Sequence, residues 1–108
     1  MISKEQQHKI LSLPGLKESI YHDLDIEKTL SFFKKRYVNT LTKIIDIKES
    51  NAIDCGCGYG WFSFAYLLSG GKSIRLIDYD SKRLQEARLI SEILNINPDS
   101  ISFEHNTI

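Results

Sequence analysis

Three glycines spaced two residues apart, Gly56, Gly58 and Gly60, separate an apolar run from an aromatic one, and Asp54 precedes them. Glycine at this density costs backbone entropy, and the usual reason is a turn with positive φ angles where something approaches the main chain. Asp78 stands at the end of the next apolar run. A carboxylate can accept hydrogen bonds from both hydroxyls of a ribose. These residues therefore predict a loop and an acid that bind a nucleotide-like ligand.

Alternating strands and helices are needed to position these residues. Hydrophobic patterning and the turn residues between the runs predict their bounds. The expected elements are a strand at 51–55, a helix at 61–68, a strand at 73–77, a helix at 81–94, a turn at 95–100 and a strand at 101–105. Four residues at helical spacing predict the inner face of the second helix: Leu84, Ala87, Ile90 and Leu94.

Helices are also expected before the first strand. Ser3 and Gln6 have the spacing of a capping box, which predicts a helix over 3–12 that Leu13-Pro14-Gly15 ends. Residues 16–24 are ambiguous. Asp25 is the expected N-cap of a long helix over 26–45. Its predicted buried stripe comprises Ile26, Leu30, Phe33, Tyr37, Leu41 and Ile44.

The alternation of strand and helix with short connections favours right-handed crossovers and a parallel sheet. We therefore predict an α/β fold, the first half of a doubly wound (Rossmann-like) sheet preceded by N-terminal helices. This gives a helical segment at 1–48 and a partial Rossmann-like, cofactor-binding domain at 49–108. In such sheets later strands pair beside the first one. Strand 51–55 is therefore expected to present a bare edge, completed by a missing C-terminal half or by self-association.

Composition excludes several classes of function. The chain of 108 residues has 14 basic and 14 acidic residues and a formal net charge of zero, so no global field favours nucleic acid or an anionic membrane. No apolar run approaches the length of a membrane span, and the N-terminus has no signal-peptide core. Two cysteines, both in the glycine loop, form no disulfide framework. A reducing, cytoplasmic setting follows as the expectation.

The run Asp54-x-Gly56-x-Gly58-x-Gly60 resembles the opening loop of class I S-adenosylmethionine-dependent methyltransferases. The resemblance extends from the first expected strand to the end of the third. It implies S-adenosylmethionine as the cofactor and methyl transfer to an unidentified acceptor. In that family the loop lies under the methionine part of the cofactor, which implies main-chain contacts at the three glycines. Asp54 would hold the loop or reach the cofactor's amino group through water, and Asp78 matches the acid that binds the ribose.

The resemblance also implies an adenine site. Tyr79 and Asp80 would lie beside the adenine. The family often has Gly-Asp after its third strand, where the acid meets the adenine amino group. This chain departs from that pattern, because Asn106 and Thr107 stand there. Either residue can supply an acceptor oxygen.

Other ligands and functions remain alternatives. The dinucleotide fingerprint is Gly-x-Gly-x-x-Gly, whereas here the third glycine comes one residue early and Trp61 holds the dinucleotide position. The spacing and the leading Asp54 favour the sulfonium cofactor. A glycine turn without a ligand, and Asp78 as a helix-capping acid, are the structural alternatives. A non-catalytic Rossmann-like assembly module and an NAD-binding oxidoreductase half-domain are the alternative functions.

No catalytic residue is predicted, because acceptor-binding and general-base residues of the resembled family mostly follow its fourth strand. We expect no turnover by these 108 residues alone. Cys55 and Cys57 do not predict a metal site, because zinc takes about four ligands and the three histidines share no motif spacing with them. Tyr21, Arg36 and Tyr37 precede the sheet and are candidates for a lid over the substrate.

Overall fold

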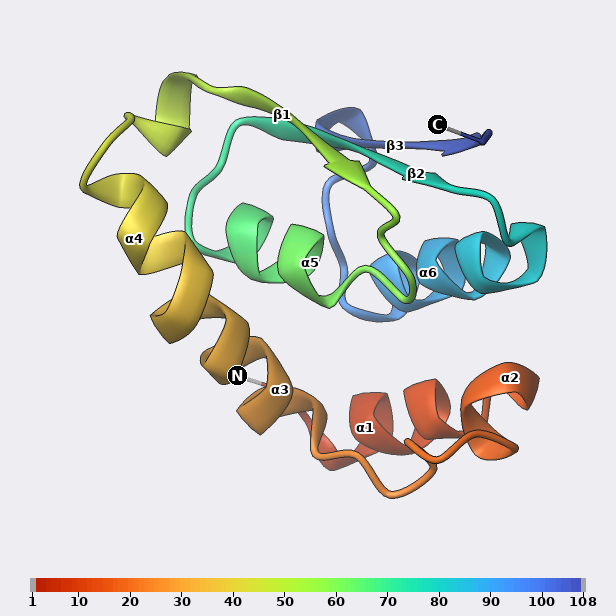
Figure 1. The fold of residues 1–108 in the computed structure, drawn as a ribbon. Helices are drawn as coiled ribbons and strands as arrows, with labels where there is room; N and C mark the ends of the chain where they lie inside the picture. Colours follow the sequence, from red (N-terminus) through yellow and green to blue (C-terminus); the bar gives the residue numbers. More distant parts are fainter. Residues whose placement is uncertain (1, 108) are drawn as a thin grey trace.

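Three parallel strands form the sheet in the computed structural model, which describes residues 2–107 (Figure 1). They are β1 (Asn51–Cys55), β2 (Ser73–Asp78) and β3 (Ile101–His105), in the order β1-β2-β3. Cys55 is paired with Ile77, so the carboxyl ends of β1 and β2 lie side by side. The prediction of an α/β fold with the first half of a doubly wound sheet is confirmed.

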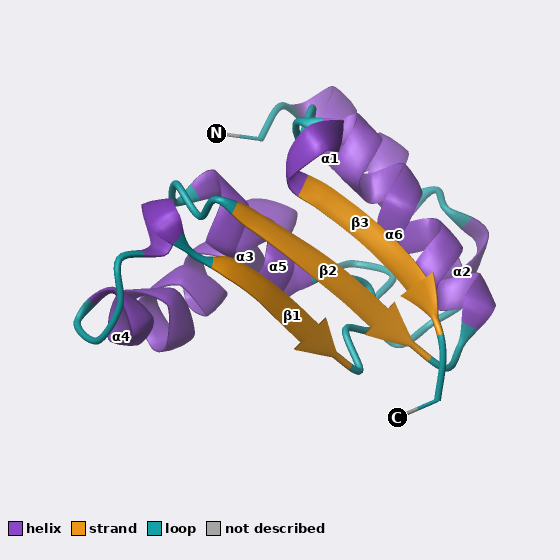
Figure 2. Cartoon of the chain, turned by 90° about the horizontal axis from the view of Figure 1, so that it is seen from above, coloured by secondary structure: helices purple, strands orange, loops and turns teal. Residues whose placement is uncertain are grey.

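The helices lie on one side of this sheet in Figure 1, and Figure 2 looks onto its other, open side. None of the helices in residues 2–107 is long and apolar enough to cross a membrane. In chain order the helical elements are α1 (Lys4–Leu11), α2 (Pro14–Lys17), α3 (Ile26–Phe33), the π-helical turn η1 (Lys34–Val38), α4 (Asn39–Thr42), the 3₁₀ turn η2 (Ile47–Glu49), α5 (Trp61–Leu68), α6 (Ser81–Ile93) and the 3₁₀ turn η3 (Pro98–Ser100).

The open side of the sheet carries both apolar and charged side chains. Ile53 and Cys55 of β1 are exposed there, and Arg75 of β2 forms an ion pair with Glu104 of β3 at 3.7 Å. β1 is an edge strand, and within residues 2–107 no further strand is paired with it. That another segment or chain completes the sheet at this edge stays a prediction.

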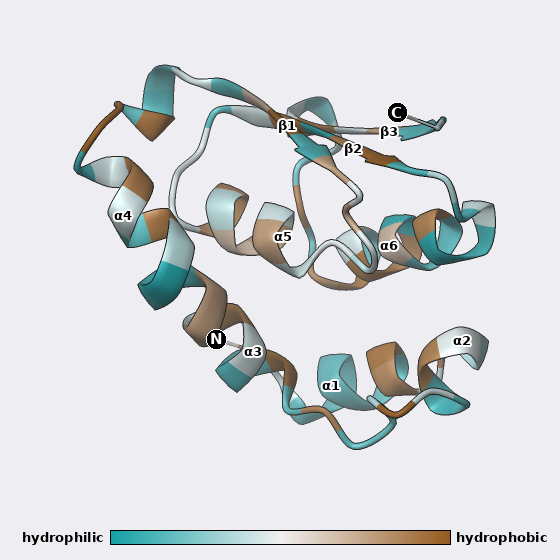
Figure 3. Cartoon of the chain, viewed as in Figure 1, coloured by the Kyte–Doolittle hydropathy of each residue, from teal (hydrophilic) through white to brown (hydrophobic). Residues whose placement is uncertain are grey.

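One hydrophobic core joins the N-terminal helices to the sheet. Ile10, Leu16 and Ile26 are fully buried in the same cluster as Leu76 of β2, and Figure 3 shows the hydrophobic residues of β2 in brown along the sheet. Polar contacts reinforce this packing, because the Glu86 carboxylate of α6 accepts hydrogen bonds from the first backbone N–H groups of α2 at 2.7 and 3.2 Å. The N-terminal segment is therefore held against the face of α6.

The sequence predicted most helix bounds well. The capping box of Ser3 and Gln6 is present in α1, and the four residues expected on the inner face of α6 are buried. The first helix ends before Leu13-Pro14-Gly15, as predicted. Pro14 also starts α2, because proline has the φ of a helix and lacks only an N–H group that the first turn leaves unpaired.

The predicted stripe of the long helix is wrong at Tyr37 and Ile44, whereas Leu41 packs against the core. Ile26 and Leu30 are buried, but Tyr37 is 45% and Ile44 74% exposed, while Val38 is fully buried. The cause is η1, where a π-helical turn replaces the α-helical one. A π turn contains more residues than an α turn, so the inward position moves from Tyr37 to Val38. The helix then ends at Thr42, before Ile44.

Substitution tests this shift. Val38→Ala should lower the free energy of unfolding by about 1–2 kcal/mol, because it leaves a cavity in the core. Ile44→Ala should change it by less than about 0.5 kcal/mol, since that side chain is exposed. Urea unfolding followed by circular dichroism measures both. Equal losses, or a larger loss at Ile44, would indicate an unbroken α-helical stripe.

Candidate functional site

The glycine loop joins the end of β1 to the start of α5 and is tied to β2. Gly56, Gly58 and Gly60 have φ angles of +71°, +59° and +92°, which L side chains rarely adopt. The N–H groups of Gly56 and Cys57 both donate to the Ile77 carbonyl, at 2.8 and 3.1 Å. The predicted positive-φ turn is therefore present, directly beside the end of the second strand.

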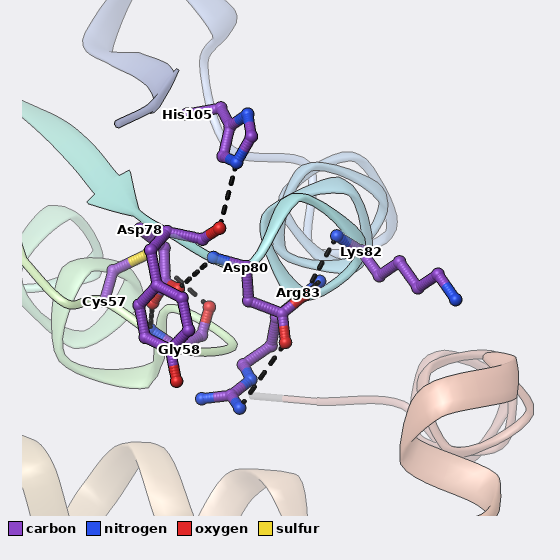
Figure 4. Close-up of polar contacts among 8 residues, drawn as sticks. Cys57, Gly58, Asp78, Asp80, Lys82, Arg83 and His105 are labelled. Carbon is purple, nitrogen blue, oxygen red and sulfur yellow. Dashed lines mark hydrogen bonds and ion pairs between the residues drawn. The ribbon is translucent and has the colours of Figure 1, made fainter. Parts of the chain in front are cut away.

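Asp78 is in direct contact with this loop. Its carboxylate accepts the Gly58 N–H at Oδ2 and the Asp80 N–H at Oδ1, both at 2.8 Å (Figure 4). The residue is only 3% exposed. A carboxylate offers about four lone-pair sites, so these two bonds leave acceptor capacity on both oxygens. The acid and the glycine loop therefore meet at one end of neighbouring strands, as the sequence predicted.

A crevice of about 280 Å³ opens at the carboxyl ends of the three strands. Five of the predicted cofactor-binding residues line it, together with Cys55 and Ile77: Gly56, Asp78, Tyr79, Asn106 and Thr107.

Two hydrogen bonds fix the rim of this crevice. The Asn106 N–H donates to the Asp78 carbonyl at 3.1 Å, and His105 Nε2 lies 2.9 Å from the Tyr79 carbonyl (Figure 4). The Tyr79 side chain is 68% exposed. These contacts hold the ends of β2 and β3 together and leave the Tyr79 ring at the rim.

The other predicted site residues have structural contacts. Asp54 accepts a hydrogen bond from the Ser63 hydroxyl of α5 at 2.7 Å. Gly60 is the N-cap of α5. Asp80 is the N-cap of α6, where it accepts two backbone N–H groups and lies 3.6 Å from Arg83. The helix-capping acid is thus Asp80 and not Asp78. Cofactor contacts of all nine predicted residues stay predictions.

A larger cavity, of about 770 Å³, lies on the other side of the loop. Gly58 is the one predicted cofactor-binding residue in its walls. The other walls include Cys57, Tyr59, Trp61 and Arg83 from the loop, α5 and α6, and residues of the segment 19–33 from the N-terminal part. Tyr21, a predicted lid residue, is among them, whereas Arg36 and Tyr37 are not. The density of aromatic residues near the loop is the sequence signal that could have indicated this region.

Comparison with known proteins identifies the fold. No protein-family model matches the chain, and no curated protein matches it in sequence. Solved structures match: WbdD, a bifunctional kinase-methyltransferase, at 25% identity and a TM-score of 0.54 over 77% of this chain and 17% of WbdD. YjhP from E. coli matches at 18% identity and a TM-score of 0.58, over 91% of this chain and 36% of YjhP. PH1948 from Pyrococcus horikoshii, assigned as an RNA methyltransferase, matches at 19% identity and a TM-score of 0.51, over 96% of this chain and 51% of PH1948.

The chain has the class I methyltransferase fold. It spans between 17% and 51% of the length of these three proteins. The part it spans is the half of the methyltransferase fold that carries the glycine loop and the first three strands.

Burial and neighbouring charges raise the pKa values of Asp54 and Cys57 at the loop of this methyltransferase fold. Burial raises the pKa of Asp54, the Ser63 hydroxyl opposes that rise, and the nearby Asp78 charge adds to it. Burial and the charges of Asp54 and Asp78 raise the pKa of the Cys57 thiol to about 12. Because the thiolate is the nucleophile and metal ligand, Cys57 is inert near neutral pH. Within residues 2–107 no group of three or more His, Cys, Asp or Glu is placed to hold a metal ion.

The glycines of the loop are required for different reasons. A Cβ at Gly60 would lie 2.8 Å from the Phe64 ring and 3.0 Å from Leu76, so close packing excludes a side chain there. A Cβ at Gly56 would meet nothing within 4 Å and would point into open space. Gly60 is therefore needed by the fold, whereas Gly56 keeps the crevice clear.

Alanine substitution separates the two roles. Gly60→Ala should lower the free energy of unfolding by about 3 kcal/mol, because a strained φ adds to overpacking. Gly56→Ala should lower it by only about 1–2 kcal/mol, from the strained φ alone. Denaturant unfolding of the two variants checks the difference. A loss at Gly56 as large as that at Gly60 would show that the crevice is not open.

The raised pKa of Asp54 predicts a pH dependence. The folded protein binds the proton more tightly than the unfolded chain, so this contribution to stability is present below pH 3.8 and is lost as pH rises through the folded pKa. Asp54→Asn should therefore gain stability relative to the unmodified chain as pH rises from about 4 to 7. Asp23→Asn, at an exposed position, is the control and should show no such trend. Thermal unfolding across this pH range measures the stability difference between Asp54→Asn and the unmodified chain. A difference that does not change with pH would contradict the raised pKa of Asp54.

Proposed function

We propose that this chain is the S-adenosylmethionine-binding portion of a methyltransferase. The observation that carries the proposal is the contact between the Gly58 N–H and the Asp78 carboxylate at the head of an open crevice. In this contact a glycine-rich loop lies next to an acid with spare acceptor capacity, on a class I methyltransferase fold.

The residues of the crevice fit this cofactor. Asp78 would accept hydrogen bonds from the ribose hydroxyls with the lone pairs that the loop leaves free. Open space above Gly56 suits close approach of the methionine part to the main chain. The exposed Tyr79 ring would lie beside the adenine, with Asn106 and Thr107 at its other edge. Asp54, Gly60 and Asp80 would support the loop and the start of α6.

The chemistry follows from the cofactor's sulfonium group, which supplies a methyl group already activated for displacement. The protein's part would then be alignment of the acceptor and exclusion of water. No residue of this chain is proposed as a general base, and turnover is not expected without segments that bind and activate the acceptor. The two free cysteines support a reducing, cytoplasmic setting.

Calorimetry with S-adenosylmethionine, S-adenosylhomocysteine and NAD tests the proposal. The first two should bind and NAD should not. Asp78→Asn should weaken their binding at least about tenfold, a loss of about 1.4 kcal/mol, and Asp23→Asn should leave it unchanged. Gly56→Ala should weaken it too, because its methyl group enters the crevice. Circular dichroism of each variant separates lost binding from lost folding.

Each of the other outcomes has a definite meaning. Binding of NAD alone would support the oxidoreductase alternative. Binding of none of the three by the folded chain would support a non-catalytic assembly module. Equal binding by Asp78→Asn and the unmodified chain would remove the ribose contact from the proposal.

A further inference from the structure

One peptide group in the connection from β2 to α6 is hydrogen-bonded at both ends. The carbonyl of Tyr79 and the N–H of Asp80 belong to this group. The Asp80 N–H donates to Asp78 Oδ1 at 2.8 Å, and the Tyr79 carbonyl lies 2.9 Å from His105 Nε2 (Figure 4). A carbonyl oxygen only accepts hydrogen bonds, so Nε2 of His105 carries the proton. A path of two hydrogen bonds therefore runs from the His105 ring through this peptide group to the Asp78 carboxylate.

The place of His105 in β3 explains why its ring reaches this peptide group. His105 is the last residue of β3 and is paired with Asp78 of β2. It follows two positions after Phe103, and the guanidinium carbon of Arg88 in α6 lies 4.5 Å from the centre of the Phe103 ring. Side chains two positions apart lie on the same face of a strand. His105 is therefore on the face that α6 covers, where the chain passes from β2 into that helix.

The His105 ring acts on the crevice from outside its lining. The described residues that line the crevice near this end of β2 and β3 are Asp78, Tyr79, Asn106 and Thr107, and His105 is not among them. Within residues 2–107, His105 supplies the one hydrogen-bond donor to the Tyr79 carbonyl. Its effect on a ligand in the crevice would therefore pass through the residues that form the lining.

The Asp78 carboxylate is the group on which this effect would fall. The Gly58 N–H holds its Oδ2 and the Asp80 N–H holds its Oδ1. Rotation of the peptide group between Tyr79 and Asp80 would turn that second N–H away from Oδ1. The hydrogen bond from His105 restrains this rotation, and hydrogen bonds at the two ends of one peptide group strengthen each other. His105 thus helps to determine the direction in which the free lone pairs of Oδ1 point.

We propose that His105 is a positioning residue of the crevice and fixes the Asp78 carboxylate through the peptide group between Tyr79 and Asp80. The lone pairs that the loop leaves free on Asp78 would then be oriented toward the ribose hydroxyls of the cofactor. The identity of this ligand rests on the proposed function. The effect of His105 on Asp78 depends only on the contacts described above, so it is measurable without a ligand.

Amide hydrogen exchange, followed by NMR, measures this effect in the unliganded chain. The Asp80 N–H should exchange slowly, because it is hydrogen-bonded to a buried carboxylate. His105→Ala should speed its exchange about fivefold, as expected for loss of one hydrogen bond. His105→Gln should restore slow exchange, because its amide nitrogen is a donor the same number of bonds from the main chain. The matched control His22→Ala removes another exposed ring that contacts a backbone carbonyl, that of Ser19 at 3.2 Å, and should have no effect.

Calorimetry with S-adenosylhomocysteine measures the consequence for binding. His105→Ala should weaken binding about fivefold, and His105→Gln should bind within about twofold of the unmodified chain. His22→Ala should leave the affinity unchanged. When Asp78→Asn is already present, His105→Ala should change the affinity by less than about twofold, because its effect passes through the carboxylate that is lost. Circular dichroism of each variant checks that it is folded.

Three results would overturn the positioning role. The first is exchange of the Asp80 N–H that is as slow in His105→Ala as in the unmodified chain. The second is equal loss of affinity in His105→Ala and His105→Gln, because the imidazole itself would then contact the ligand. The third is additive losses from His105→Ala and Asp78→Asn. If the unmodified chain does not bind S-adenosylhomocysteine but His105→Ala still speeds the exchange, the proposed function is overturned and the effect of His105 on Asp78 stands.

Discussion

One hydrogen bond, from the Gly58 N–H to the Asp78 carboxylate, connects the two features on which the site depends. Three glycines with positive φ have little intrinsic reason to keep one shape, because glycine loses more conformational freedom on folding than any other residue. A buried carboxylate, in turn, requires donors. Each supplies what the other lacks, and the bond is of the stronger, charge-assisted kind. The turn and the acid are therefore positioned as one unit at the head of β1 and β2.

Three carboxylates lie at this end of the sheet, and their contacts differ. Asp54 faces the helices and accepts a hydrogen bond from Ser63, which ties β1 to α5 on both sides of the turn. Asp80 caps α6 and faces Arg83. Asp78 lines the crevice and keeps acceptor capacity on both oxygens. A ligand at the strand ends would therefore find one carboxylate available and two engaged in holding the elements that frame it.

Local sequence signals predicted the sheet, the turn and α6 because each depends on residues close in sequence: strand runs, glycine spacing and apolar residues at helical spacing. The π turn η1 could not be predicted this way. Tyr37 and Val38 are both apolar, so the choice between them depends on what α3 packs against. Pro14 shows the same limit, since a proline both ends one helix and starts the next. The position of the crevice could be predicted, because the carboxyl ends of neighbouring parallel strands meet at one edge of the sheet. The larger cavity could not, because it depends on the long-range contact of the N-terminal segment with α6.

That long-range contact gives the N-terminal helices a role beyond covering the core. Glu86 of α6 accepts the first N–H groups of α2, and Gln6 of α1 donates to the Ile93 carbonyl at 2.9 Å. These bonds hold the segment before α3 opposite the glycine loop, so that the loop forms one wall of each of two spaces. The N-terminal helices therefore shape the cavity on one side of the glycine loop, whereas the crevice at the strand ends, on the other side, is lined without them.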